Sequence, residues 1–155
     1  MDQDVAVSDL SKDRLRAWLR ILKVTRMIEA ELRERMRTSW DMTLPRFDVM
    51  AALSRVSEGM KMSDLSGVLR VSNGNVTGIV DRLVTDGLVE RRAVEGDRRA
   101  NRVVLTPEGR VLFDEMAAVH ERWVDELLSP IGAQGLETLR TRLGRIIDRL
   151  EETNG

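Results

Sequence analysis

The chain has 155 residues, a formal net charge of −1, no cysteine and a single histidine, His120. It is long enough for one domain or one lobe of an oligomer. Thiol chemistry is excluded, as is any zinc site built from cysteine and histidine within one chain. The acidic N-terminus has no apolar signal segment and no long apolar run follows it, so we expect a cytoplasmic protein without a membrane span.

Positive charge is concentrated in one part of the chain. Residues 70–110 contain eight Lys and Arg against six Asp and Glu, whereas residues 111–155 contain five against nine. Five of those arginines lie between positions 91 and 102. An acidic protein can therefore still present one basic face to nucleic acid.

The N-terminal third predicts a flexible arm over residues 1–12 and a helix over residues 13–38. This helix carries two neighbouring apolar stripes, whereas a helix that packs only within its own domain needs one. The first stripe contains Leu15, Trp18, Leu19 and Leu22, and the second contains Ala17, Ile21, Val24 and Ile28. We therefore expect part of this helix to meet another subunit.

A second helix is predicted from Pro45 to about Ser57, because proline suits the first helical turn. Two interpretations are open for the side chains around its start. They line an apolar pocket with one cationic anchor, or they belong to an ordinary core beside a loop tryptophan. These candidate effector-pocket residues are Trp40, Arg46, Phe47 and Met50.

A helix-turn-helix is predicted next: a short strand at residues 60–62, a helix over 64–70 with Ser63 as N-cap, a turn over 71–73, and a helix that ends before Gly87. One face of the last helix is apolar. The opposite face is short and polar and includes two glycines, each costing about 1 kcal/mol relative to alanine. Such a face suits close approach to a DNA groove, although a solvated helix with tolerated glycines is the alternative.

A charged hairpin follows, with strands predicted over residues 88–94 and 102–105 and a loop over 95–101. Arg98 and Arg99 at the loop tip suit a narrow minor groove, where the negative potential attracts guanidinium groups. Asp97 is expected to orient Arg99 through a bidentate ion pair. The alternative is a solvated charged hairpin.

The C-terminal third predicts two more helices. Thr106 and Pro107 supply an N-cap and a first-turn proline for a helix that runs to about Leu128. In the final helix, apolar residues follow the alternating steps of three and four that are typical of a coiled-coil seam. These seam residues are Leu136, Leu139, Leu143, Ile146 and Leu150.

Several linked motifs in this order resemble the MarR family of winged-helix transcriptional regulators, and the resemblance covers nearly the whole chain. It implies a mainly α fold with a small β-wing, in which a winged helix-turn-helix DNA-binding domain (45–106) is flanked by N- and C-terminal dimerisation helices (13–38 and 107–152). The motifs are Leu69-Arg70-Val71-Ser72, Val76-Thr77, Val80-Asp81-Arg82-Leu83, Asp86-Gly87-Leu88-Val89-Glu90-Arg91, Asp97-Arg98-Arg99 and Val104-Leu105-Thr106-Pro107-Glu108-Gly109.

The resemblance also implies which residues meet double-stranded DNA. A homodimer would place each recognition helix in a major groove and each wing in a minor groove, on a pseudo-palindromic operator. The implied recognition-helix contacts are Ser72, Asn73, Asn75, Thr77 and Arg82, and the wing contacts are Asp97, Arg98 and Arg99.

Family members commonly act as repressors that a small aromatic acid releases from DNA. The segment from Thr43 to Asp48 is similar to one in relatives that control the degradation of aromatic acids, some of which respond to the coenzyme A thioester. An aromatic acid or its coenzyme A thioester is therefore the expected effector.

Two other classes of function compete with this interpretation. A winged-helix protein-interaction module would have lost its basic hairpin and polar recognition face, and both are intact here. An enzyme is not expected, because His120 lies among apolar neighbours without a nucleophile, and no phosphate loop, metal site or catalytic triad is present in the sequence. No cofactor is expected either.

Overall fold

The structure is a computed structural model that describes the backbone of residues 2–69 and 73–155, and the side chains of residues 9–69, 75–96 and 101–155. The chain divides into two compact units, Met1–His120 and Glu121–Gly155. Each unit is described by itself.

The first helix, α1, spans Asp2–Trp40, so residues 2–12 are helical where the sequence predicted a flexible arm. Ion pairs between residues three or four positions apart stabilise this helix, such as the pair between Arg35 Nε and Glu31 Oε1 at 2.7 Å. Asp41, with φ of 52°, ends the helix in the left-handed region.

Helix α2 spans Leu44–Ser54 and ends three residues before the predicted Ser57. Thr43 is its N-cap, with a side-chain oxygen that accepts from the Arg46 backbone N–H at 3.3 Å. Proline lies in the first turn as predicted, since a missing N–H costs nothing there.

The helix-turn-helix consists of α3 (Met62–Leu69) and α4 (Asn73–Thr85). Ser63 lies inside α3, so its predicted N-cap role is wrong, and the turn predicted at residues 71–73 falls mostly outside the described residues. Gly87, with φ of 74°, lies beyond the end of α4 as predicted, and Leu88 N–H donates to Leu83 O at 2.9 Å. A left-handed glycine with such a bond is a common helix ending.

A three-stranded antiparallel sheet follows the order β1-β3-β2, with β1 at Met60–Lys61, β2 at Val89–Val94 and β3 at Asp97–Leu105. The loop predicted over residues 95–101 is therefore wrong, because only two residues separate β2 from β3. The register shifts between Ala93, which pairs with Asn101, and Val94, which pairs with Asp97. Residues 98–100 form a bulge in β3, and bulges redirect side chains and increase strand twist.

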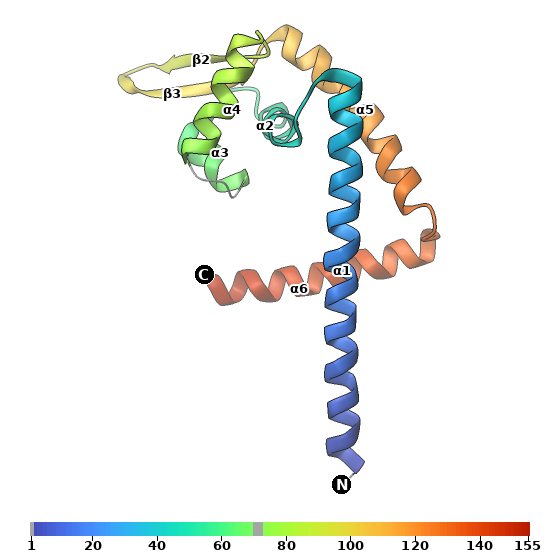
Figure 1. The fold of residues 1–155 in the computed structure, drawn as a ribbon. Helices are drawn as coiled ribbons and strands as arrows, with labels where there is room; N and C mark the ends of the chain where they lie inside the picture. The colour runs from blue at the N-terminus through green and yellow to red at the C-terminus, as the bar shows by residue number, and fades with distance from the viewer. Residues whose placement is uncertain (1, 70–72) are drawn as a thin grey trace. The chain divides into compact units, whose positions relative to one another are not determined.

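The core of the first unit lies where α2, α3 and α4 meet the base of the sheet, and the β2–β3 hairpin extends beyond it (Figure 1). The helices contribute apolar faces of 3.6-residue period and the strands alternate residues. The fully buried side chains include Val49, Met50, Leu53, Leu65, Val76, Val80, Leu83, Val89 and Val103.

Helix α5 spans Pro107–Leu128, and its start is fixed against the end of α4. Thr106 caps it as predicted, accepting from Gly109 N–H at 2.9 Å, while the Thr106 hydroxyl donates to Gly87 O at 2.7 Å. Gly109 lies close to the backbone just before β2, because a Cβ at that position would lie 1.9 Å from Leu88 O.

The second unit contains the end of α5 and helix α6, Ala133–Asn154. No residue of α6 is buried, and Leu139, Ile146, Ile147 and Leu150 are exposed. Within the described part of the chain, no helix has the length and apolar character needed to cross a membrane.

Candidate nucleic-acid interface

Helix α4 has one buried face and one exposed polar face. Val76, Val80 and Leu83 are fully buried, and this anchoring turns the opposite face to solvent. Asn75, Thr77 and Arg82, all predicted DNA contacts, are exposed. Of the other predicted contacts on this helix, Asn73 has only its backbone described and Ser72 lies outside the described residues. These contacts remain predictions.

The exposed face of α4 also contains Gly78, where an added Cβ would meet no atom within 4 Å. The glycine is therefore not needed for packing within the described structure. A backbone that is open at this point allows another surface to approach α4 without a side chain in between.

An ion pair joins α4 to the first strand of the wing. The Arg91 guanidinium on β2 donates to the Asp81 carboxylate on α4. Sequence analysis identified neither residue as part of this pair. The contact links α4 to the hairpin through one partly exposed ion pair.

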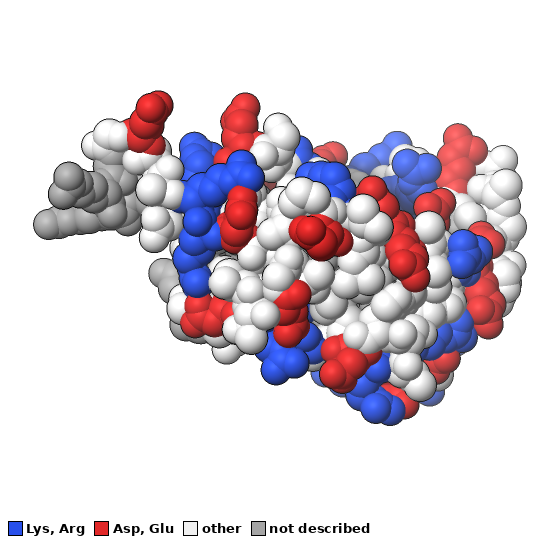
Figure 2. Space-filling model, turned by 90° about the horizontal axis from the view of Figure 1, so that it is seen from above, with Lys and Arg blue, Asp and Glu red and all other residues white. Residues whose placement is uncertain are grey.

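The wing is formed by β2 and β3. The three residues of the bulge, 98–100, include two of the predicted wing contacts, Arg98 and Arg99, which lie in the strand and not at the tip of the turn. The turn itself is Glu95-Gly96, with a Gly96 φ of 85°. The side chains of residues 97–100 are outside the description, so the predicted pairing of Asp97 with Arg99 is untested. Figure 2 shows a column of Lys and Arg atoms toward the left of the view, and over the rest of this face Lys and Arg are mixed with Asp and Glu.

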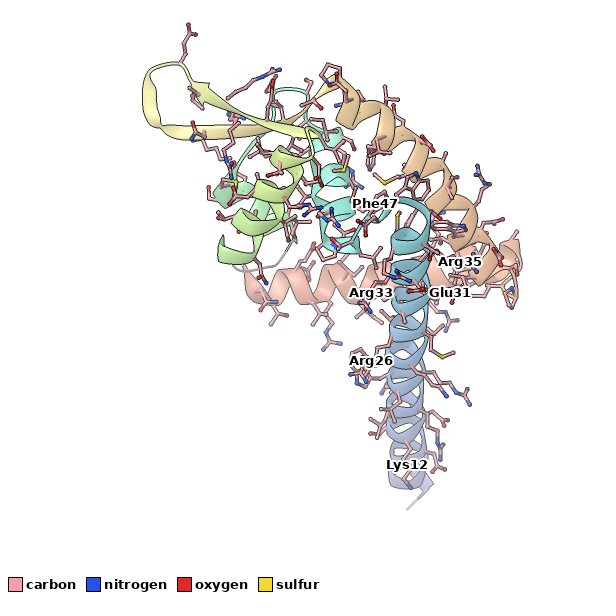
Figure 3. All side chains as sticks on the ribbon, turned by 45° about the horizontal axis from the view of Figure 1, so that its top comes forward. Lys12, Arg26, Glu31, Arg33, Arg35 and Phe47 are labelled. Carbon is pink, nitrogen blue, oxygen red and sulfur yellow. The ribbon has the colours of Figure 1, made fainter. Side chains whose placement is uncertain are left out.

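The structure places the candidate effector-pocket residues in different surroundings. Phe47 and Met50 are buried in the core, which agrees with the alternative of ordinary packing. The Phe47 ring contacts the rings of Phe113 and His120 on α5, with centroids 5.6 and 4.9 Å away (Figure 3). Trp40 is half-buried at the end of α1.

Two titratable groups lie beside this aromatic cluster. Burial raises the pKa of Asp48 above its ordinary value, and the nearby His120 partly offsets this rise. Burial lowers the pKa of His120, against the smaller opposing effect of Asp48. Burial thus favours the neutral form of His120, whose ring packs against Phe47.

Two cavities lie between the start of α2 and the exposed face of α4. One has a volume of about 450 Å³ and is lined by Thr43, Arg46, Asn75, Gly78, Ile79 and Arg82. The other has a volume of about 530 Å³ and is lined by Arg33, Arg37, Asp41, Met42, Thr43, Leu44, Pro45, Asn75 and Ile79. Arg46 therefore does border a cavity, whereas Phe47 and Met50 line neither of these two.

The helix-turn-helix, followed by a hairpin paired to a short first strand, defines a winged helix-turn-helix protein. Residues 40–100 match the family model described as MarR family. The chain is 32% identical over 130 residues to the transcriptional activatory protein BadR of Rhodopseudomonas palustris, covering 82% of this chain and 69% of that protein. It is 29% identical over 126 residues to the HTH-type transcriptional regulator PecS of Dickeya dadantii, covering 80% and 75%.

A solved structure of a mutant of MarR from E. coli complexed with operator DNA also resembles the chain. Its TM-score is 0.72 and its identity 28%, covering 81% of this chain and 89% of that one. The chain belongs to the MarR family and is a transcriptional regulator of the MarR type.

Proposed function

We propose that this regulator is a homodimer that binds a pseudo-palindromic DNA operator and represses the genes beside it. The observation that carries the proposal is the exposed face of α4, which is polar, contains an open glycine and is tied to an arginine-rich wing. An α-helix with such a face fits the major groove, where short polar side chains and arginine contact base edges and phosphates.

The proposed contacts have separate roles. Asn75 and Thr77 would read base edges, Arg82 would contact base or phosphate, and Arg98 and Arg99 would enter the minor groove. Because base contacts specify sequence and phosphate contacts mainly position the protein, loss of these groups should have different effects. Loss of Thr77 should reduce discrimination between sequences more than it reduces non-specific affinity.

Unpartnered apolar surface supports the proposed dimer. On α1, Leu15, Trp18, Leu19 and Val24 are exposed, and on α6 so are Leu139, Ile146 and Leu150. An exposed apolar stripe on a helix marks an interaction site, and a second copy of the chain supplies equivalent apolar stripes.

The experiment is fluorescence anisotropy with DNA from upstream of the protein's own gene and with a scrambled control. We expect preferential binding that weakens steeply with salt, because bound cations release condensed counterions from DNA. Equal binding to both fragments would overturn the proposal in favour of an interaction module. A promoter reporter would test repression, which predicts lower transcription when the protein is present.

We further propose that an aromatic acid or its coenzyme A thioester releases the protein from DNA. The 530 Å³ cavity suits the aromatic acid group of such a ligand, because Met42, Leu44 and Ile79 supply apolar lining and Arg33 and Arg37 supply positive charge. Arg37 pairs with Glu34 at 2.7 Å, whereas Arg33 has no ion-pair partner among the described residues.

Benzoate and 4-hydroxycinnamate, each as the free acid and as the coenzyme A thioester, are suitable probes of release. If the cavity is the site, Arg33→Ala should raise the concentration of active probe needed for release. Arg26→Ala is a matched control, since Arg26 lies nearer the N-terminus of α1 than Arg33 does (Figure 3) and lines neither cavity. Equal effects of the two substitutions would contradict this location.

A further inference from the structure

Arg46 on α2 is held by three acceptors that come from two different parts of the fold. Its Nη2 donates to Asp41 O at 2.8 Å and its Nε to Thr43 Oγ1 at 3.1 Å, both in the turn between α1 and α2. Its Nη1 donates to Asp86 Oδ2 at 3.4 Å, just beyond the end of α4. Only 13% of the Arg46 side chain is exposed, so water screens these bonds weakly.

Asp86 serves two arginines at once. The same Oδ2 that accepts from Arg46 also accepts from Arg82 Nε at 3.2 Å. Arg82 is 60% exposed on the polar face of α4, while Asp86 is 30% exposed. One carboxylate thus connects an anchored arginine with one that faces solvent.

This arrangement restricts Arg82 more than an ordinary ion pair on a helix would. An exposed pair four residues apart contributes little, because both side chains must lose conformational freedom to meet. Here Asp86 is already held by Arg46, and Arg46 is held by the turn. Less conformational freedom is therefore lost when Arg82 pairs with Asp86. The Arg82 guanidinium is thus preorganised before a ligand arrives.

We propose that Arg46 is a positioning residue for DNA binding, which sets the orientation of Arg82 through Asp86. The inference rests on the proposed DNA-binding function. It also reassigns Arg46, which the sequence suggested as an anchor for an anionic effector. Three of its five guanidinium N–H donors are engaged with Asp41, Thr43 and Asp86.

The test compares Arg46→Met and Arg82→Ala, singly and together, by anisotropy on one operator. Arg82→Ala should weaken binding about tenfold in the wild-type background but less than threefold when Arg46 is methionine, because Arg82 is then no longer oriented. A tenfold loss in both backgrounds would overturn the inference. Arg35→Met is the matched control, since Arg35 pairs with Glu31 within α1, and the Arg82→Ala effect should stay tenfold there.

Asp86→Asn provides a second route if Arg46→Met folds poorly, since it leaves the bonds from Arg46 to Asp41 and Thr43 in place. It should reduce the Arg82→Ala effect in the same way, and a full tenfold effect would contradict the inference. Arginine Nε–H signals in proton–nitrogen spectra give a readout without DNA. Exchange of the Arg82 Nε–H with water should accelerate in both variants, and an unchanged rate would refute the positioning role even if no operator is bound.

Discussion

Substitution of Gly78 by alanine should stabilise the free protein and yet weaken its binding to DNA. Gly78 lies within α4, and a Cβ there would meet no atom within 4 Å. Alanine is favoured over glycine inside a helix by about 1 kcal/mol. For a domain of this size that gain raises the midpoint of thermal unfolding by about 2–4 °C. The free protein therefore gives no structural reason for glycine at this position.

The DNA complex should supply that reason. If α4 lies in a major groove with its backbone close to the DNA, the added methyl group occupies space needed at the interface. We expect Gly78→Ala to weaken operator binding about tenfold, which corresponds to about 1.4 kcal/mol. Thermal unfolding and anisotropy on the same samples measure the two effects.

Gly67→Ala is the matched control for this prediction. Gly67 lies in α3, is exposed, and likewise has no atom within 4 Å of an added Cβ. It should gain stability by a similar amount and keep wild-type affinity. If Gly78→Ala is stabilised and binds the operator as tightly as the wild type does, then this point of α4 does not approach DNA closely and the reasoning is refuted.

Three further predictions concern the wing, the start of α5 and the aromatic cluster. Arg99→Ala should weaken operator binding at least tenfold without dissociating the dimer, as anisotropy and light scattering would show; unchanged affinity at matched salt would remove Arg99 from the interface. Gly109→Ala should destabilise the fold by about 3 kcal/mol, because the new Cβ would collide with the Leu88 carbonyl; unchanged chemical denaturation would contradict this close approach. Because burial lowers the pKa of His120, the unfolded state binds more protons, so stability should fall as pH drops below about 6.5. His120→Gln should reduce that fall, and an identical pH profile in the variant would assign it to other groups.

Patterns within single elements predicted most of the fold. The apolar period of α4, the left-handed Gly87 and the capping pair Thr106 and Pro107 each depend on a few neighbouring residues, and the structure confirms these features. Local physical preferences act over this distance, so they can be read directly from the sequence.

Errors arose where pairing between elements decides the outcome. The charged composition of the seven residues between the predicted strands favours a loop, but ladder pairing with β2 extends β3 back to Asp97 through a bulge. Charge does not prevent a solvated hairpin from forming strands. The helical residues 2–12 also show that an acidic, polar start is compatible with a long helix.

Only part of the candidate site can be predicted, because some of its contacts join residues that lie far apart in the sequence. The polar face of α4 follows from helical periodicity, whereas the links from Arg46 to Asp86 and from Arg91 to Asp81 connect residues 40 and 10 positions apart. No spacing rule identifies such partners. Phe47 and Met50 could not be assigned to a pocket or a core because apolar residues line both.

Hydroxyl-radical footprinting on DNA from upstream of the gene shows whether two copies of α4 contact two half-sites on one face of the duplex. We expect two protected segments about one helical turn apart, which are lost together in a Thr77→Ala variant that still binds DNA non-specifically. A single protected segment, or uniform weak protection along the fragment, would contradict this expectation.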